Sequence, residues 1–143
     1  MEASVRSNSA AREAWQLFWR IFMEDKRRRW AILSDLGISP QQSMALSTLK
    51  PGEAMPMSAL ADAMHADNSS ITGVVDRLEA AGLAERRPDE RDRRVKAVIL
   101  TERGEWLRVE IDRRAGQPPP RLANLSERDA TELRDILARA LED

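Results

Sequence analysis

The stretch from Asp67 to Lys96 constrains the fold of this chain more than any other part of the sequence. Asp67 is a good N-cap, because its carboxylate can accept hydrogen bonds from the unpaired N–H groups of a first helical turn. Gly82 is a good end for the same helix, since glycine adopts the left-handed conformation that often follows a helix C-terminus. Between them, apolar residues recur at helical spacing and predict one buried face: Ile71, Val74, Val75 and Leu78.

A basic hairpin is predicted directly after this helix. Residues 83–87 can form a strand, Pro88 and the two acidic residues after it turn the chain, and residues 95–100 return it as a second strand. Six basic residues lie in or beside the turn: Arg86, Arg87, Arg91, Arg93, Arg94 and Lys96. A helix followed by a basic hairpin is the arrangement of a winged helix-turn-helix. We therefore predict a mainly α fold with a small β-hairpin wing.

Two shorter helices are predicted before this stretch. Ser39 and Gln42 have the spacing of a capping box, and Pro40 suits the first helical position between them. The apolar positions of that helix are Met44, Ala45, Leu46 and Leu49. Residues 57–64 predict the supporting helix of the helix-turn-helix. Its side chains expected to face inward are Leu60, Ala61 and Met64.

Both ends of the chain predict helices with apolar faces. A helix from Ala11 places aromatic residues on one face, namely Trp15, Phe18, Trp19 and Phe22. The monomer core can cover part of this face, and a partner subunit is the sharper alternative, because aromatic residues are enriched at interfaces. The last helix carries a regular stripe that also needs a packing partner: Leu133, Ile136, Leu137, Ala140 and Leu141. Between them, Pro118–Pro120 predicts an extended spacer.

Composition excludes several classes of function. The net charge of 143 residues is −1, so any affinity for nucleic acid must come from local clusters of charge. The chain has no cysteine, which excludes disulfides and a thiol redox switch. His65 is the only histidine, and no metal, phosphate-loop or nucleophile motif is present, so we expect neither an enzyme nor a bound cofactor. No apolar run reaches membrane-spanning length, so we expect a cytoplasmic protein.

The central motifs resemble those of the MarR family of transcriptional regulators. The shared features are the D-x-S-x-x-T start of the helix, its D-R-L-E-x-x-G-L exit, the D-R-R of the wing and the L-T-x-x-G that follows, all within Asp67 to Gly104. The family often carries arginine where this chain has Gly73. The resemblance implies a homodimer that binds palindromic double-stranded DNA as a regulator, with repression relieved by a small aromatic or anionic effector. A winged-helix module that binds proteins instead of specific DNA is the alternative.

A recognition helix of this kind enters the major groove, where the pattern of donors and acceptors distinguishes all base pairs. The residues expected to face bases or nearby phosphates are Asn68, Ser69, Ser70 and Thr72. Arg77 is expected either to bind phosphate or to pair with Asp92 and so fix the wing to the helix. The wing arginines expected in or beside the minor groove are Arg91, Arg93 and Arg94.

The residue pattern and the resemblance together give the expected domains, and the resemblance gives the expected effector contacts. Residues 1–10 are expected to be a flexible N-terminus, 11–36 a dimerisation helix, 37–100 the DNA-binding domain and 101–143 the C-terminal dimerisation helices. The candidate effector contacts are Trp19, Trp30, Met44 and His65. A structural role is the alternative for each of these residues: the tryptophans and the methionine as core residues, and the histidine at a helix end.

Overall fold

The computed structural model describes residues 9–142, so the predicted flexible segment 1–10 lies almost entirely outside the described residues. The chain divides into two compact units. Residues 29–116 form the first, and residues up to Arg28 together with those from Gln117 onward form the second. Helix α1 (Ser9–Asp35) contributes to both units. Along the described residues, no helix combines the length and the apolar character needed to cross a membrane.

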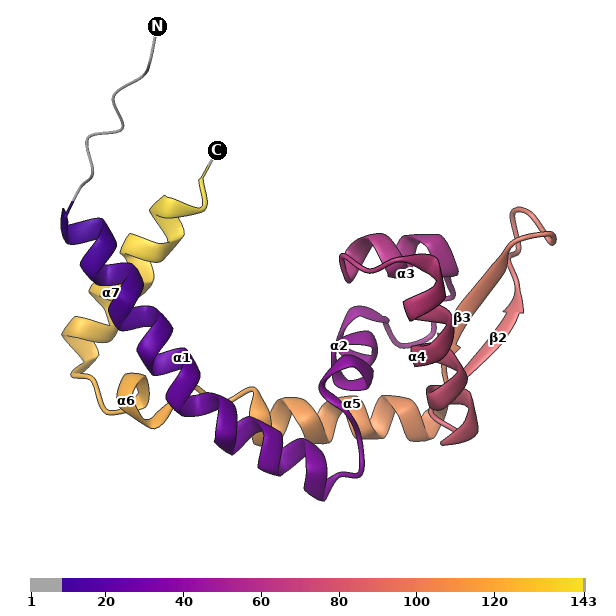
Figure 1. The fold of residues 1–143 in the computed structure, drawn as a ribbon, viewed down its shortest axis with the longest axis horizontal. Coiled ribbons are helices and arrows are strands. Elements are labelled where there is room, and N and C mark those ends of the chain that lie inside the picture. The colour runs from indigo at the N-terminus through magenta and orange to yellow at the C-terminus, as the bar shows by residue number, and fades with distance from the viewer. Residues whose placement is uncertain (1–8, 143) are drawn as a thin grey trace, which may run out of the picture. The chain divides into compact units, whose positions relative to one another are not determined.

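The unit of residues 29–116 is a winged helix-turn-helix, which confirms the predicted fold class (Figure 1). After the last turns of α1 come α2 (Pro40–Thr48), β1 (Met55–Pro56), α3 (Met57–Ala63), α4 (Asn68–Ala80), β2 (Ala84–Pro88), β3 (Lys96–Leu100) and α5 (Glu102–Ala115). The strands form an antiparallel sheet in the order β1-β3-β2. Strand β1 was not predicted from the sequence; its Met55 pairs with Val98 of β3.

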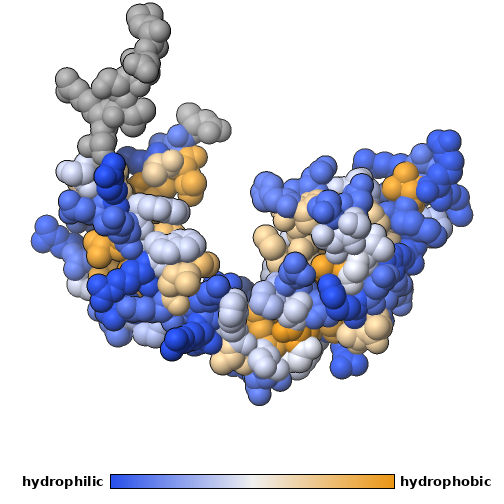
Figure 2. Space-filling model, viewed as in Figure 1, coloured by the Kyte–Doolittle hydropathy of each residue, from blue (hydrophilic) through white to orange (hydrophobic). Residues whose placement is uncertain are grey.

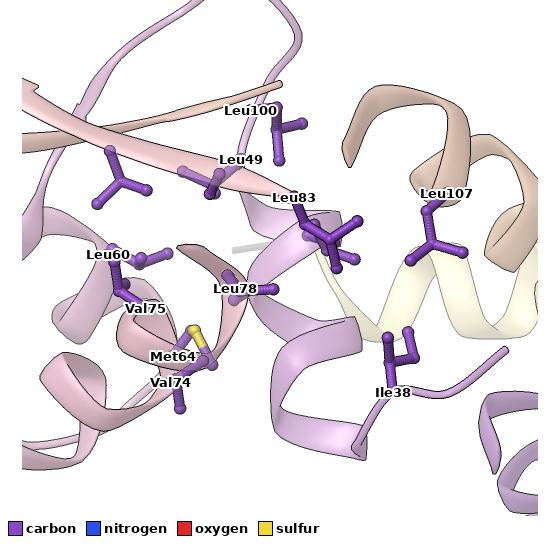
Figure 3. Packing of buried hydrophobic residues seen from close by; sticks show 14 of the residues in the cluster. Ile38, Leu49, Leu60, Met64, Val74, Val75, Leu78, Leu83, Leu100 and Leu107 are labelled. Carbon is purple, nitrogen blue, oxygen red and sulfur yellow. The ribbon is translucent and has the colours of Figure 1, made fainter. Parts of the chain in front are cut away.

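The core of this unit lies where α2, α3 and α4 pack together against the sheet and α5 (Figure 3). Its largest fully buried side chains are Leu46, Leu49, Leu60, Ile71, Val75, Leu78 and Val98. The predicted inner faces of α3 and α4 are therefore confirmed. Met44 differs from the prediction, because its side chain is 49% exposed although Ala45 and Leu46 beside it are buried.

The predicted helix ends are confirmed by their hydrogen bonds. The Ser39 hydroxyl accepts from the Gln42 N–H at 3.1 Å, and the Ser39 N–H donates to the Gln42 side chain at 2.8 Å. After α4, Gly82 adopts φ +70° and its N–H donates to the Glu79 carbonyl at 2.9 Å, as in a Schellman motif. His65 has the same place after α3, with φ +50°, so this exposed histidine has a structural role at a helix end.

The L-T-x-x-G motif joins α5 to the turn after α4. The Thr101 hydroxyl donates to the Gly82 carbonyl at 2.6 Å and accepts from the Gly104 N–H at 3.1 Å. Gly104 lies so close to this turn that a Cβ atom would be 1.9 Å from the Leu83 carbonyl oxygen. The motif is therefore explained by packing within the unit.

The second unit contains the N-terminal part of α1, α6 (Pro120–Ala123) and α7 (Glu127–Ala140). Pro119 has the extended backbone of polyproline, but Pro120 begins α6, so the predicted spacer ends one residue early. Arg121 forms an ion pair with Glu24 of α1, and Arg28 donates to the Gln117 carbonyl at 3.2 Å. These bonds attach the proline segment to α1.

The apolar faces of this second unit are only partly covered by the described chain. Three pairs of rings stack along α1: Trp15 with Phe18 at 5.7 Å between centroids, Trp15 with Trp19 at 6.2 Å, and Trp19 with Phe22 at 5.5 Å. All four side chains are exposed, and α7 has no buried residue. Hydrophobic surface is visible on the C-terminal helix (Figure 2). The described chain therefore covers only part of this aromatic face, and its burial by a partner subunit stays a prediction.

Candidate nucleic-acid interface

The first turn of α4 presents short polar side chains on a fixed backbone. The Asp67 carboxylate accepts from the Ser70 N–H at 2.7 Å and from the Ser69 hydroxyl at 2.9 Å. The Thr72 hydroxyl donates to the Asn68 carbonyl at 2.8 Å. Asn68, Ser69, Ser70 and Thr72 are all exposed, so the structure brings the four predicted recognition residues together on one accessible surface.

The cap at Asp67 gives a pH-dependent prediction. The Ser70 N–H, followed by the Ser70 and Ser69 hydroxyls, holds the pKa of Asp67 below its ordinary value of 3.8. A depressed folded pKa means that the stabilisation is present above the unfolded value and is lost as the pH falls through the folded value. We expect Asp67→Ala to lower the melting temperature at pH 7, and this difference from wild type to shrink below about pH 4.

Circular dichroism melts at a series of pH values between neutral and strongly acidic check this prediction. Asp67→Asn is the control, because asparagine keeps a capping oxygen but does not titrate. A difference between wild type and Asp67→Ala that stays constant over the whole range would contradict the assignment of Asp67 as a charged cap.

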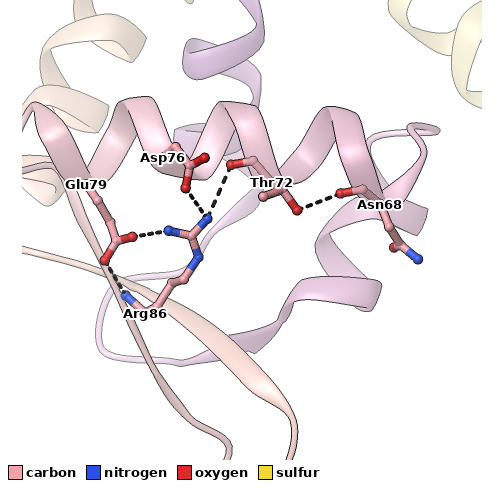
Figure 4. Close-up of polar contacts among 5 residues, drawn as sticks. All are labelled: Asn68, Thr72, Asp76, Glu79 and Arg86. Carbon is pink, nitrogen blue, oxygen red and sulfur yellow. Dashed lines mark hydrogen bonds and ion pairs between the residues drawn. The ribbon is translucent and has the colours of Figure 1, made fainter.

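Arg86 joins β2 to the recognition helix (Figure 4). Its guanidinium donates to the Asp76 carboxylate at 2.6 Å, to the Thr72 carbonyl at 3.2 Å and to the Glu79 carboxylate, and its backbone N–H donates to Glu79 at 3.2 Å. Partial burial would lower the pKa of Arg86, but the bonds to Asp76 and Glu79 outweigh this effect and raise it. The helix-to-wing link predicted for Arg77 and Asp92 is thus made by Arg86, a residue that the sequence analysis counted only among the basic residues of the wing.

The wing is held by two aspartates at its turn. Asp89 accepts from the Arg91 N–H at 2.8 Å, while its own N–H donates to the Val95 carbonyl at 2.8 Å. Asp92 accepts two bonds from the Arg94 guanidinium and one from its backbone N–H, each at 3.1 Å. The Arg94 side chain, and then its N–H, lower the pKa of Asp92. Asp92 therefore orients Arg94, whose side chain remains 91% exposed.

The three predicted wing arginines are all exposed at this turn. Arg91, Arg93 and Arg94 follow one another within four positions, and the bonds of Asp89 and Asp92 fix the backbone that carries them. Arg77 is also exposed, on α4. This part of the unit thus combines exposed cations with the polar start of a helix, which is a chemistry suited to phosphates and base edges.

The candidate effector residues belong to both units: Trp19 to the second, and Trp30, Met44 and His65 to the unit of residues 29–116. Trp19 and Met44 are about half exposed, and His65 ends α3. Trp30 lines a cavity of about 330 Å³ with Leu33, Ser34, Ile38 and Pro40. Within the described residues, no group of three or more histidines, aspartates or glutamates is arranged to hold a metal ion.

A second cavity contains residues that the sequence analysis missed. It measures about 300 Å³, lies in the unit of residues 29–116, and is lined by Arg29 of α1, Ser43 and Ser47 of α2, and a face of α5 that includes Arg108 and Asp112. The Nε of Arg108 is buried without a hydrogen-bond acceptor in the described chain. The sequence gives no signal for this site, because its residues come from three separate helices.

Comparisons with known proteins agree with this architecture. A family model described as the MarR family matches residues 38–96. Two Bacillus subtilis proteins are similar to the chain. The uncharacterized HTH-type transcriptional regulator YfiV is 33% identical over 95 residues, 66% of this chain and 59% of that protein. The HTH-type transcriptional repressor MdtR is 35% identical over 69 residues, 48% of this chain and 44% of that protein. These matches span less than two thirds of either relative.

Solved structures extend the likeness over nearly the whole chain. A MarR family protein from Bacillus stearothermophilus superposes with a TM-score of 0.80 at 26% identity, covering 95% of this chain and 96% of that one. A mutant of MarR from E. coli, complexed with operator DNA, gives a TM-score of 0.69 at 24% identity, covering 89% of this chain and 92% of that one, and supports the fold alone. With the motifs and the winged unit described above, these findings show that the chain is similar to the MarR family of transcriptional regulators in the sequence of residues 38–96 and in fold over nearly its whole length.

Proposed function

We propose that this protein regulates transcription by binding specific sequences in double-stranded DNA. The observation that carries the proposal is the arrangement within one compact unit of an exposed, polar helix start on α4 and a wing with three exposed arginines. MdtR is described as a transcriptional repressor, and the similar E. coli structure contains operator DNA. The first comparison favours repression as the mode of regulation, and the second favours operator DNA as the ligand.

In this mechanism the two elements have different tasks. The start of α4 enters the major groove, where Asn68, Ser70 and Thr72 meet base edges that distinguish all four base pairs. Arg94 contacts phosphate or a narrow minor groove, where attraction depends mainly on charge and groove width. The bonds from Asp92 hold Arg94 in one orientation before DNA arrives, which reduces the entropy lost on binding.

A second copy of the chain supplies the other half of the site in this proposal. The exposed aromatic residues of α1 and the apolar stripe of α7 belong to the same compact unit, which we assign to dimerisation. A two-fold dimer presents two recognition helices and therefore binds a palindrome with half-sites about one helical turn apart.

The DNA-binding proposal predicts different effects for Arg94→Ala and Thr72→Ala. Arg94→Ala should weaken binding to operator and random DNA alike, and reduce the slope of log affinity against log salt by about one per protomer. Thr72→Ala should leave that slope unchanged and reduce discrimination against single-base variants, each of which normally costs roughly 1–3 kcal/mol. Titrations of both DNAs at several salt concentrations measure both quantities.

Arg113→Ala is the matched control for charge. Arg113 is exposed on α5 and paired with Glu110 at 2.9 Å, away from the wing. It should bind DNA as wild type does. If Arg94→Ala leaves both the salt slope and random-DNA affinity intact, the wing does not contact DNA, and the protein-binding alternative for this winged helix is favoured.

We also propose that a small aromatic carboxylate is the effector and that it binds in the cavity of Arg29 and Arg108. The buried Nε of Arg108 lacks an acceptor, and a carboxylate supplies one to the guanidinium group. Asp112 in the same cavity favours a ligand that also carries a hydroxyl donor. Because α2 packs against both α5 and α4, a ligand that draws α2 toward α5 changes the support of the recognition helix.

The effector proposal is tested with 4-hydroxybenzoate as the probe. At ten times its dissociation constant, a ligand stabilises the folded state by about 1.4 kcal/mol, which raises the melting temperature by roughly 4 °C. We expect this rise for wild type and for Arg103→Met, an exposed neighbour on α5, but not for Arg108→Met. An equal rise in Arg108→Met would place the binding site elsewhere.

A further inference from the structure

Arg86 differs from the other basic residues around the wing in the direction of its bonds. Its side chain is only 23% exposed and donates to groups on α4 at Thr72, Asp76 and Glu79. These acceptors are spaced four and three residues apart, so they lie along one face of the helix over about two turns. A single residue of β2 is thus hydrogen-bonded to α4 from Thr72 to Glu79.

The surroundings of Arg86 make it a poor ligand for DNA. Two carboxylates already neutralise its charge, and each of its terminal nitrogens donates to a group on α4. A phosphate bound to this guanidinium would also lie close to the carboxylate of Asp76, whose side chain is 61% exposed. Negative charges repel one another, so the Asp76 and Glu79 carboxylates that bind Arg86 disfavour the binding of a phosphate beside it.

The bonds of Arg86 also connect directly to the candidate base-contacting groups. The Thr72 carbonyl accepts from Arg86, while the Thr72 hydroxyl donates to the Asn68 carbonyl (Figure 4). On the other side, Arg86 lies opposite Val98 in the β2–β3 ladder, and this hairpin carries Arg94 at its turn. The guanidinium of Arg86 therefore links the recognition helix α4 to β2, the first strand of the wing.

We propose that Arg86 is a positioning residue for DNA recognition, which sets the orientation of the wing relative to α4 so that both can engage one operator together. The inference rests on the proposed DNA-binding function. Arginine suits this role because its planar fork can donate to several acceptors at fixed angles, whereas the ammonium of lysine cannot reproduce that geometry. Without Arg86, the start of α4 and the wing are both still present, but they are no longer held in the relative orientation in which both contact the DNA.

A double-mutant cycle between Arg86→Met and Arg94→Ala tests this inference. Arg94→Ala in the wild-type background should weaken operator binding about tenfold, as expected for one charge-assisted contact. In the Arg86→Met background the same change should weaken binding only about two- to threefold, because a wing that is no longer held has already lost much of the contact. Asp76 and Glu79 both reach solvent, so Arg86→Met does not strand a buried charge.

Arg87→Met provides the matched control cycle. Arg87 is the next residue on β2, carries the same charge, and its ion pair, with Glu85 at 3.7 Å, lies within the strand. Its effect should be additive with that of Arg94→Ala, within about twofold. Arg86→Lys should recover only part of the coupling, since it restores charge without the fork.

The outcomes separate the possible roles of Arg86. Additive effects of Arg86→Met and Arg94→Ala would show that Arg86 contacts DNA independently, and would overturn the proposal. A lower melting temperature with unchanged operator affinity would show a purely structural role, and would also overturn it. If wild type binds no operator more tightly than random DNA, the proposed DNA-binding function is wrong. This result differs from both outcomes for Arg86, because it is measured on wild type alone.

Discussion

Gly104→Ala should unfold much of the population of this protein at temperatures where wild type is fully folded. A Cβ atom at this position would lie 1.9 Å from the carbonyl oxygen of Leu83 and 2.9 Å from its carbonyl carbon. That carbonyl cannot simply move away, because it accepts the Thr101 N–H at 3.1 Å. The backbone must therefore shift at the junction of α4, β2 and α5, at an expected cost of about 3 kcal/mol or more.

Gly73→Ala is the control with the opposite sign. Gly73 is inside α4, and the nearest atom to an added Cβ would be a terminal nitrogen of Arg77 at 3.8 Å, which is an ordinary contact. The same substitution should there stabilise the protein by roughly 0.5–1 kcal/mol, because alanine loses less conformational freedom in a helix. Urea denaturation of both variants measures the two free energies of unfolding. A Gly104→Ala protein as stable as wild type would show that α5 can pack without this close approach.

Helix ends are the part of this fold that the sequence predicts best. The caps at Ser39 and Asp67, and the left-handed turn at Gly82, depend on hydrogen bonds between residues two to five positions apart. Such bonds are specified by local residue types, so reading the chain in order suffices to find them. Strand β1 shows the contrast, because its two residues pair with β3 more than forty positions later.

Burial and ion pairing are the properties that the sequence predicts less well. Met44 has the helical spacing of a core residue but lies at the surface, since only one face of the short α2 meets the core. Arg86 belongs by composition to the basic wing, yet its partners on α4 lie seven, ten and fourteen positions earlier in the sequence. The reversal of the chain between α4 and β2 determines which carboxylates the guanidinium of Arg86 can reach.

The candidate site follows the same division. The exposed residues at the start of α4 and in the wing could be predicted, because each group occupies one short segment. The cavity of Arg29 and Arg108 could not, because three helices contribute to it and neither arginine stands in a recognisable motif. The effector contacts suggested by the family resemblance were Trp19, Trp30, Met44 and His65, whereas the structure offers the buried Nε of Arg108 without an acceptor.

Trp19→Glu should convert the protein from a dimer to a monomer at micromolar concentration. Trp19 stacks with Trp15, which precedes it on α1, and with Phe22, which follows it, so it lies in the middle of this aromatic row. Its side chain is 51% exposed in the single chain, and the proposed partner subunit covers it. Burying a carboxylate there without a cation, while losing an aromatic anchor, should weaken dimerisation at least about a hundredfold.

Sedimentation over a dilution series measures this change, and Trp106→Glu is its control. Trp106 is a tryptophan of comparable exposure, 62%, but it lies on α5 in the winged unit. The same charge introduced there should leave the dimer intact.

The monomeric Trp19→Glu protein should keep its folded winged unit, because none of the residues that form the core of that unit lies near position 19 in sequence. It should nevertheless bind a palindromic operator far more weakly, since one recognition helix at a time contacts the DNA and the gain from joining two half-sites is lost. A Trp19→Glu protein that sediments as a dimer at the same concentrations would show that the aromatic face of α1 is not the dimer interface.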